Sequence, residues 1–237
     1  KLWRSNGLDL RLSPYGCVAT GDEIGMIEVV LNSKTTADIT KKAGGASAAF
    51  KSDPLDKWLR DLNSTPDQHA TAVDNFIRSC AGYCVATYVL GIGDRHNDNI
   101  MCTEDGRLFH IDFGHFLGNY KKKFGYKRER APFVFTPDFA KVMGGKDSVD
   151  YKRFVDIACR AYNLIRNNAN LFVNLFAMML STGIPELTSA EDLEYLRDAL
   201  SPEMTEAQAA VKFADLINEA LTAKSTQLNN AFHILAH

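Results

Sequence analysis

Three polar side chains that can take part in catalysis stand close together in one short segment of the chain. Asp94, His96 and Asn99 lie within the sequence GDRHNDN, and Asp112 opens an Asp-Phe-Gly triplet after a short stretch of chain. Carboxylate and amide oxygens bind Mg²⁺ against the phosphates of a nucleotide, and a nearby carboxylate or imidazole can serve the acceptor hydroxyl. The combination favours phosphoryl transfer over a polar turn followed by a chance triplet.

The chemistry of each side chain suggests its role. Asp112 is the strongest candidate for a Mg²⁺ ligand, and Asn99 is the candidate for the second metal position, because an amide oxygen suits an ion held mostly by phosphates and water. Asp94 and His96 remain alternatives for the base, since a carboxylate can accept the hydroxyl proton and an imidazole titrates near neutral pH. Arg95 is expected to pair locally rather than to act in catalysis.

Two further histidines flank the triplet. His110 alternates into a predicted strand, which favours a packing role. His115 follows the triplet directly, and two roles are open for it. It could contact the terminal phosphate of a nucleotide, or it could make an ordinary hydrogen bond within the loop.

The surrounding segments predict a mixture of strands and helices. Residues 10–20 and 26–30 predict two strands, and residues 31–34 predict a polar connector. Residues 99–102 and 107–111 predict a hairpin. The expected helices are one that begins with Asp53 as N-cap and Pro54 at its first position, a central buried one over 67–90, and others over 137–143, 148–168, 170–180, 189–199, 203–222 and 226–236.

The order of the catalytic residues is distinctive. The protein-kinase template has a His-Arg-Asp loop, whereas this chain reads Asp94-Arg95-His96. The sequence GDRHNDNIM followed by LFHIDFGHFLGN resembles the phosphoinositide 3-kinase and phosphoinositide 3-kinase-like family. The stretches GLDLRLSPYGCVATGDEIGMIEVV, RSCAGYCVATYVL and KKKFGYKRERAPFVFT are similar to it too, and the last resembles the activation loop of the class I enzymes. The resemblance runs from about residue 2 to about residue 221.

This resemblance implies an α+β, protein-kinase-like fold, of which the chain is a fragment with short N-lobe strands and a mainly α-helical C-lobe. It implies ATP and Mg²⁺ as cofactors and transfer of the γ-phosphoryl group to the 3-hydroxyl of a phosphoinositide lipid at a membrane surface. The implied boundaries are the end of the N-lobe at 1–30, a hinge at 31–34 and the C-lobe at 35–237, which contains a catalytic loop at 91–100, an activation loop at 112–137 and a C-terminal helix at 226–236.

The resemblance also implies where adenine would bind. Backbone groups at the junction between strand and connector would offer the adenine edge an acceptor and a donor. Apolar side chains would enclose the ring, and a tyrosine would line the back of the pocket. The implied nucleotide-binding residues are Tyr15, Ile27, Glu28, Val30, Met101 and Ile111.

A basic segment, residues 121–130, follows the Asp-Phe-Gly triplet. It carries six basic residues and one acid, although the formal net charge of the chain is only −2. Lysine and arginine at this position match a polyanionic inositol headgroup through charge-assisted hydrogen bonds. In the class I family such basic residues are associated with the doubly phosphorylated headgroup, and protein-directed and phosphatidylinositol-only relatives lack them. The candidate substrate-binding residues are Lys121, Lys122, Lys123, Lys127, Arg128 and Arg130.

Composition limits the remaining possibilities. The small net charge gives no general attraction to nucleic acid, and the longest apolar runs are far too short to span a bilayer. No signal peptide is visible, and five cysteines without a C-x-x-C pair predict reduced thiols in a cytosolic protein. We therefore expect a cytoplasmic protein that is recruited peripherally to membranes and has no nucleic-acid partner. The family resemblance adds a regulatory subunit in the full protein.

Two features depart from the family pattern. The chain has no G-x-G-x-x-G loop and no V-A-I-K-like strand lysine, so the isolated chain is expected to bind nucleotide poorly and to be inactive without another segment. The helix predicted over 226–236 contains Phe232 as its only aromatic residue, which argues against insertion into a membrane. The alternatives are a related protein Ser/Thr kinase, a phosphatidylinositol 4-kinase and a non-catalytic scaffold fragment.

Overall fold

A computed structural model describes residues 1–44, 53–118, 122–123, 126–127 and 131–223. This part of the chain is mixed α/β and mostly helical, and its strands pair antiparallel in small sheets. The helices are α1 (Leu2–Ser5), α2 (Thr36–Lys42), α3 (Pro54–Leu62), α4 (Pro66–Val89), α5 (Pro137–Val142), α6 (Val149–Arg166), α7 (Ala169–Met179), the short 3-10 helix η2 (Leu180–Thr182), α8 (Asp192–Leu200) and α9 (Glu206–Thr222). The strands are β1 (Cys17–Gly21), β2 (Ile24–Ile27), β3 (Ser33–Thr35), β4 (Ile100–Thr103), β5 (Leu108–His110), β6 (Lys122–Lys123) and β7 (Tyr126–Lys127).

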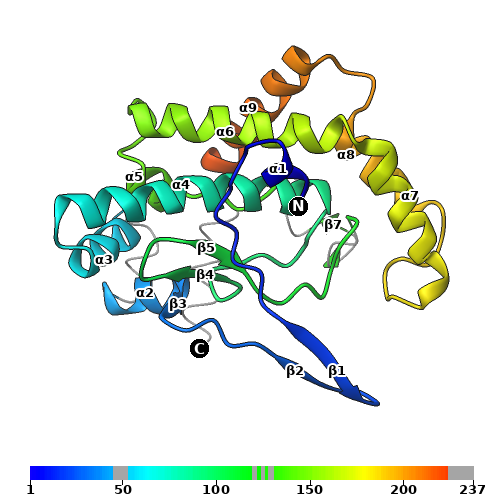
Figure 1. Ribbon diagram of the computed structural model, residues 1–237, viewed down its shortest axis with the longest axis horizontal. Helices are drawn as coiled ribbons and strands as arrows, with labels where there is room; N and C mark the ends of the chain where they lie inside the picture. Colours follow the sequence, from blue (N-terminus) through cyan, green and yellow to red (C-terminus); the bar gives the residue numbers. More distant parts are fainter. Residues whose placement is uncertain (45–52, 119–121, 124–125, 128–130, 224–237) are drawn as a thin grey trace.

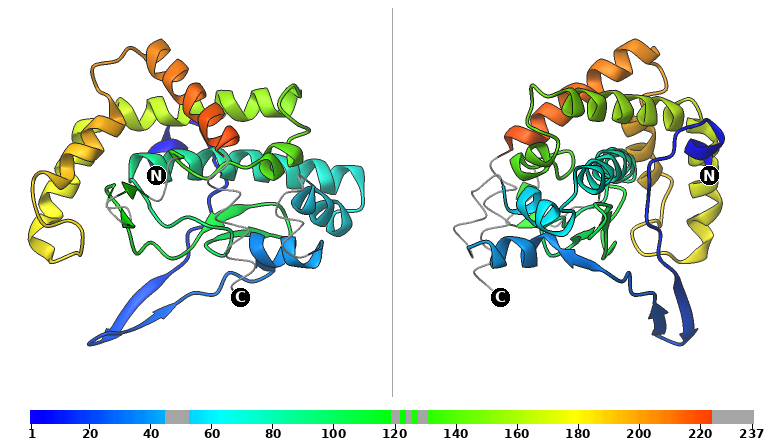
Figure 2. Two further views of the ribbon diagram at one scale, coloured as in Figure 1. Left: turned by 180° about the vertical axis from the view of Figure 1, so that it is seen from behind. Right: turned by 60° about the vertical axis from the view of Figure 1, so that its left-hand side comes forward.

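Helix α4 forms the centre of the molecule. Helix α6 runs across one side of it and the sheet β3-β4-β5 lies on the other, while α9 packs on α6 (Figures 1 and 2). Phe76, Ile77 and Val85 of α4 are completely buried, as expected for a helix that is apolar on nearly all sides. Its start is set by a capping box, in which Thr65 and Gln68 satisfy each other's backbone N–H groups. The central helix is therefore the platform on which the sheet rests.

The sheet is attached to α4 by both packing and a hydrogen bond. Its strand order is β3-β4-β5, and Ile100 and Cys102 of β4 are buried in the core. The hydroxyl of Ser79 in α4 accepts a hydrogen bond from the Leu108 N–H over 2.9 Å. Met101 alternates to the opposite face and is half-buried. Because the hairpin is fixed on α4, the loops at its ends have fixed positions too.

Most of the helix predictions within the described residues are confirmed, with ends displaced by at most three residues. Asp53 does precede α3, but its side chain makes no capping bond, and Asp138 accepts the Leu55 N–H over 3.1 Å instead. The connector predicted over 31–34 contributes two residues to β3, and α2 was not predicted. The helix predicted over 226–236 lies outside the described residues.

The strand predicted over residues 10–20 is wrong in its first part, because regular pairing begins only at β1. Arg11 has a φ of 50°, which a strand does not tolerate, and Pro14 lacks a backbone donor. Leu10 is buried against α4 instead, where a Cβ on Gly82 would lie 2.7 Å from the Leu12 side chain. Packing on the helix therefore replaces sheet pairing in this segment.

The hairpin β1–β2 extends away from the rest of the molecule (Figures 1 and 2). Its strands pair antiparallel, with Val18 opposite Met26 and an irregularity between Ala19 and Gly21. Every residue in both strands is exposed, including Val18 at 57% and Met26 at 64%. Apolar side chains exposed to this degree indicate a surface suited to contact with a ligand or with another part of a protein.

The described helices include none that is both long and apolar enough to cross a membrane. The five cysteines, all within the described residues, are free, and Cys80, Cys84 and Cys102 are buried. Burial raises the pKa of the Cys102 thiol above its usual range, so it is a packing group rather than a nucleophile.

Candidate active site

The β4–β5 hairpin brings the two candidate metal ligands together. Ile100 pairs with His110, and the Ile111 N–H donates to the Asn99 carbonyl oxygen over 3.0 Å, so the pairing continues one residue beyond the strands. Asn99 therefore lies opposite Ile111, the residue directly before Asp112. Two residues well separated in the sequence become neighbours because the hairpin is antiparallel.

Arg95 fastens the catalytic loop to the Asp-Phe-Gly turn. Its Nε donates to the Gly93 carbonyl over 2.9 Å, one terminal nitrogen donates to the Ile111 carbonyl over 2.7 Å, and the other donates to the Asp112 carbonyl. The side chain is buried, and its guanidinium lies 5.6 Å from the centre of the Phe113 ring. A guanidinium carries five N–H donors in a fixed planar fork, which suits it to serve three carbonyls at once. Arg95 thus pairs locally, as predicted.

Asn99 connects the backbone of Asp94 with the ring of His96. Its Nδ2 donates to the Asp94 carbonyl oxygen over 2.9 Å and lies 3.1 Å from Nε2 of His96. Both contacts use the amide nitrogen, so Oδ1 is the amide atom suited to bind a cation. Asp98 approaches the other ring nitrogen of His96, with its N–H at 3.3 Å and its carboxylate at 3.8 Å. The choice between Asp94 and His96 as the base stays open.

Both aspartates of the predicted site have a left-handed backbone conformation. The φ angle is 56° at Asp94 and 58° at Asp112. Such a conformation costs a non-glycine residue about 1 kcal/mol or more and persists where the surroundings determine it. Asn99 holds the carbonyl of Asp94, and Arg95 holds that of Asp112. Residues strained in this way are concentrated at functional sites.

These residues fit a Mg²⁺ ion that is shared with a nucleotide. Asp112 is an exposed residue, and the recorded side-chain bonds of Asn99, which pairs with the neighbouring Ile111, use only its amide nitrogen. The described part of the chain has no group of three His, Cys, Asp or Glu residues that could hold a metal alone. The protein would therefore supply few ligands, and phosphate and water oxygens the others, which is how Mg²⁺ is usually held at kinase sites.

A second backbone pairing ties the segment after the triplet to the start of the catalytic loop. A Cβ at Gly91 would lie 2.5 Å from the backbone nitrogen of Gly118 and from the ring of Tyr195, so only glycine fits at this crossing. Tyr195 of α8 covers the crossing and is itself held by a hydrogen bond to the Tyr88 carbonyl. The pairing consists of Gly93 N–H to His115 O at 2.9 Å, Leu117 N–H to Leu90 O at 2.8 Å and Gly118 N–H to Gly91 O at 3.2 Å.

Glu186 holds the residues that follow the triplet. It lies between η2 and α8, its Oε1 is 2.6 Å from Nδ1 of His115, and its Oε2 accepts the Phe116 N–H over 2.7 Å. Of the two roles left open by the sequence, a phosphate contact and an ordinary hydrogen bond, the structure shows a hydrogen bond for His115. Its partner lies on a distant loop and not within its own loop. Sequence reasoning missed Glu186, because it stands 71 residues from His115 in a Pro-Glu-Leu triplet that carries no catalytic pattern.

His110 is a packing residue beneath this site, as predicted. It is 2% exposed, and its ring stacks on Tyr83 with 5.2 Å between ring centres. Burial, together with the positive charge of Arg95, lowers the pKa of His110 to about 3. Its Nδ1 has no hydrogen-bond partner among the described residues. A neutral imidazole thus separates α4 from the catalytic loop.

Three of the predicted nucleotide-binding residues lie near the metal-binding candidates. Met101 and Ile111 are half-buried on the face of the hairpin that points away from α4. The ring of Tyr15 packs edge-on against Phe109, which shares that face. Burial raises the pKa of Tyr15, and the negative charge of Asp112 contributes in the same direction.

The other three predicted nucleotide-binding residues stand on the hairpin β1–β2 or just after it. Ile27 is 67% exposed, and the Glu28 N–H donates to the Gly16 carbonyl over 2.8 Å. The Val30 carbonyl accepts a hydrogen bond from the Ser33 hydroxyl over 2.7 Å. These bonds leave the Glu28 carbonyl and the Val30 N–H as the backbone groups that can meet a ligand. The adenine site itself stays a prediction.

The basic segment falls outside the residues whose side chains the structure describes. The backbones of β6 and β7 pair antiparallel, so the stretch predicted as a loop contains a short hairpin. The predicted substrate-binding side chains that lie outside the described set are Lys121, Lys122, Lys123, Lys127, Arg128 and Arg130.

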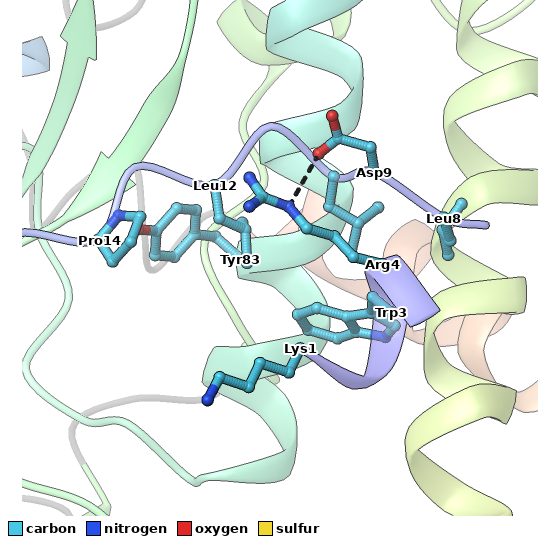
Figure 3. A pocket seen from close by; sticks show the side chains of 9 residues that line it. Lys1, Trp3, Arg4, Leu8, Asp9, Leu12, Pro14 and Tyr83 are labelled. Carbon is cyan, nitrogen blue, oxygen red and sulfur yellow. Dashed lines mark ion pairs between the residues drawn. The ribbon is translucent and has the colours of Figure 1, made fainter. Parts of the chain in front are cut away.

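A cavity of about 430 Å³ lies apart from the catalytic candidates, between the N-terminal segment and α4 (Figure 3). Tyr83 forms part of its wall, and an ion pair of 3.7 Å between Arg4 and Asp9 lies beside it. None of the predicted catalytic or metal-binding residues lines it. The other lining residues are Lys1, Trp3, Leu8, Leu10, Leu12 and Pro14.

Comparison with known proteins places the chain in a family. The family described as phosphatidylinositol 3- and 4-kinase matches residues 1–189. Since the match covers most of the chain, the chain belongs to the phosphatidylinositol 3- and 4-kinase family. This confirms the family resemblance seen in the catalytic loop and the Asp-Phe-Gly segment.

Individual relatives are similar along the full length of the chain. It is 67% identical over 238 residues to phosphatidylinositol 3-kinase 1 of Dictyostelium discoideum and 59% identical over 237 residues to phosphatidylinositol 3-kinase 2 of that organism. It is 49% identical over 238 residues to phosphatidylinositol 4-phosphate 3-kinase C2 domain-containing subunit alpha of Pongo abelii. The chain spans only 13% to 15% of the length of these three relatives.

Proposed function

We propose that the protein containing this chain transfers the γ-phosphoryl group of ATP to the 3-hydroxyl of a phosphoinositide headgroup, with Mg²⁺ as cofactor. The observation that carries the proposal is the placement of Asn99 beside Asp112, on a hairpin fastened by Arg95 to the Asp94–His96 loop. The high identity to proteins named phosphatidylinositol 3-kinase supports the choice of a lipid acceptor. In a protein-kinase-like fold, the described residues would form the hinge and C-lobe side of the active site.

The proposed roles divide between metal binding and proton transfer. Asp112 and the Oδ1 of Asn99 would hold Mg²⁺, which bridges phosphate oxygens and offsets the charge that develops on them. Either Asp94 or His96 would receive the proton of the attacking hydroxyl. Arg95 would act on the reaction through the backbone, because three of its donors engage carbonyl groups.

The proposed nucleotide site is built from two surfaces. Tyr15, Met101 and Ile111 would face the ring from the side of the metal-binding candidates, a choice supported by the packing of Tyr15 on Phe109, which pairs with Met101. The residues on and after the hairpin β1–β2 would complete the site, with backbone groups that meet the adenine edge. Ile27 is exposed and free to pack on an aromatic ring, which supports its role as the opposite wall.

The acceptor is proposed to be a doubly phosphorylated phosphoinositide, as in the class I enzymes. The support is the excess of positive charge between residues 121 and 130 on a chain of net charge −2. A second candidate is the singly phosphorylated lipid, because a relative with 49% identity carries phosphatidylinositol 4-phosphate in its name. We propose further that the protein is cytoplasmic, acts at the membrane surface and works with a regulatory subunit, in line with the class I resemblance.

The substrate assignment is tested with the full-length protein and vesicles that contain one lipid at a time: phosphatidylinositol, its 4-phosphate or its 4,5-bisphosphate. We expect the wild type to prefer the bisphosphate and to place phosphate on the 3-hydroxyl, as read by chromatography of the deacylated product. The variant Lys127→Ala/Arg128→Ala should lose activity on the bisphosphate roughly tenfold or more, as expected when charge-assisted contacts are removed, and much less on phosphatidylinositol.

A matched control removes two exposed lysines elsewhere, in the variant Lys146→Ala/Lys152→Ala. It changes the charge equally and should leave the substrate preference unchanged. An equal loss on all three lipids in the Lys127→Ala/Arg128→Ala variant would contradict the assignment of the basic segment to headgroup selection. Product phosphorylated at the 4-hydroxyl, or phosphorylation of protein alone, would overturn the proposed reaction.

A further inference from the structure

Glu186 grips two consecutive residues directly after the Asp-Phe-Gly triplet. One carboxylate oxygen lies 2.6 Å from His115 Nδ1 and the other accepts the Phe116 N–H over 2.7 Å. The side chains of His115 and Glu186 are 29% and 21% exposed, so the contact is largely shielded from water. Bonds of this length to a carboxylate are among the stronger hydrogen bonds in proteins. Glu186 is therefore well placed to fix the course of the chain after the triplet.

The loop that carries Glu186 is itself held in one conformation. Glu186 has a φ of 70°, which is unfavourable for a residue with a side chain, and the next residue, Leu187, is completely buried. The Leu187 N–H donates to the Ile184 carbonyl over 3.2 Å, which closes a turn around Glu186. A strained backbone kept in place by a buried neighbour is typical of a functional constraint.

His115 passes this constraint to the catalytic loop. Its carbonyl accepts the Gly93 N–H over 2.9 Å, and Gly93 in turn accepts a hydrogen bond from the Arg95 side chain. A displacement of His115 would therefore be felt at the residue directly before Asp94. The same displacement would move the end of the triplet that begins with Asp112.

We propose that Glu186 is a positioning residue for the phosphoryl-transfer reaction, acting through His115 and Phe116 on the geometry of Asp112 and the catalytic loop. The inference rests on the proposed function for the identity of the reaction. With Nδ1 of His115 engaged by Glu186, Nε2 is the ring nitrogen through which His115 can meet a ligand. Glu186 thus sets the direction of the His115 ring as well as the path of the backbone.

The test compares substitutions of Glu186 in the full-length protein. Glu186→Ala removes both contacts and should lower kcat about 10- to 100-fold, as expected for a small misplacement of reacting groups. The KM for ATP should change less than about threefold, because the bonds from Glu186 to His115 and Phe116 involve no nucleotide-binding candidate. Glu186→Gln keeps an acceptor for the Phe116 N–H and a polar partner for His115, and should recover kcat to within about fivefold of the wild type.

A double substitution tests the path of the effect. If Glu186 acts through His115 and its neighbour, the pair Glu186→Ala/His115→Ala should be scarcely slower than the slower single variant. The matched control is Glu191→Ala, which removes an exposed glutamate a few residues further along the chain and should leave kcat unchanged. Melting temperatures within about 3 °C of the wild type would show that the fold is retained.

Several results would overturn the proposal. These are a Glu186→Ala variant as fast as the control, a glutamine variant as slow as the alanine variant, or full additivity with His115→Ala. Each rate is measured with lipid as acceptor and with water, as ATP hydrolysis. A wild type that hydrolyses ATP but phosphorylates no phosphoinositide would refute the proposed function, while the ratio of hydrolysis rates would still test Glu186.

Discussion

The catalytic segment, residues 90–118, and the hairpin β1–β2 are held in opposite ways. In the catalytic segment, Arg95 serves three carbonyls and Glu186 grips two successive residues from a distant loop. The strands of the hairpin pair with each other, and Val18 and Ile27 remain 57% and 67% exposed. The first region is fixed by polar bonds within the described chain, whereas the second is fixed only along its own strands.

The difference indicates which half of the active site is complete by itself. Arg95 and Glu186 each hold several backbone groups at once, and such networks favour a single arrangement, so the candidate metal-binding side is held in one geometry by the described chain itself. In the hairpin, Val18 and Met26 point to one face and Cys17 and Ile27 to the other, so both faces are apolar. Strands that are apolar on both faces suit burial on both sides. The proposed nucleotide side would therefore depend on further contacts for its geometry.

The largest expected effect is the loss of the metal-binding carboxylate. Asp112→Ala in the full-length protein should lower turnover at least about 1000-fold, because a bound metal contributes several kcal/mol to the stabilisation of developing charge. Lipid phosphorylation is the measurement, and the melting temperature should stay close to that of the wild type. The control Asp147→Ala removes an exposed carboxylate outside the site and should have no effect. Near-normal turnover in Asp112→Ala would remove the metal role.

The next largest effect concerns the bonds that brace the catalytic segment. Arg95→Lys keeps the charge but offers a single ammonium group in place of a fork, so at least one of the three carbonyls loses its partner. We expect a loss of about 2–3 kcal/mol in stability, which reflects a buried unsatisfied group, and a drop in turnover of at least about tenfold. Thermal unfolding and lipid phosphorylation measure the two effects.

Arg160→Lys is the matched control, because Arg160 pairs with Asp156 at 3.9 Å on an exposed face. Surface pairs of this kind contribute little, so neither stability nor turnover should change. If Arg95→Lys behaved like this control, the catalytic segment would not be braced in the way that the comparison with the hairpin requires.

A moderate effect is expected on the pH dependence of stability, through His110 beneath the catalytic segment. Burial lowers the pKa of His110 from 6.5 to about 3 in the folded protein. Between these values the unfolded chain binds a proton that the folded chain does not, so stability is lost as pH falls below about 6.5. His110→Phe removes the titration and keeps a ring to stack on Tyr83. The melting temperature should therefore fall less between pH 7 and about pH 5 in the variant.

The smallest effect is predicted in the hairpin. Ile27→Ser should raise the KM for ATP about fivefold, which is the effect expected when one modest apolar contact is lost. The kcat should not change. Ile24→Ser is the matched control, since both isoleucines are 67% exposed and only Ile27 is a predicted nucleotide contact. Equal KM values in the two variants would show that the hairpin does not line the nucleotide site, and that the contrast with the catalytic segment has no functional meaning.

The catalytic candidates could be found from the sequence because their chemistry needs particular residue types at short spacing. Asp94, His96 and Asn99 fall on one loop, and Asp112 follows a hairpin whose strands alternate as expected. The helices could be placed for a similar reason, since capping residues such as Thr65 act on backbone groups only a few positions away. Residue spacing and capping patterns are sufficient for prediction where the interacting groups lie within one helical turn or one hairpin.

Other features depend on contacts between distant parts of the chain. Glu186 could not be recognised, because its role exists only when the loop after η2 meets His115. The segment around Leu10 has the composition of a strand, yet it packs on α4 at Gly82. In the same way, Asp138 rather than Asp53 satisfies the start of α3. In each case a long-range partner supplies more free energy than the local preference.

The sequence by itself determined the family and the helical body and named the catalytic candidates, because these follow from local chemistry and periodicity. The tertiary structure alone decided how Arg95 divides its donors among three carbonyls and which glutamate holds the residues after the triplet. The physical reason is that a hydrogen bond between distant residues depends on the packing of whole elements. Packing of α4 against α6 and the sheet sets those positions, and no short pattern encodes it.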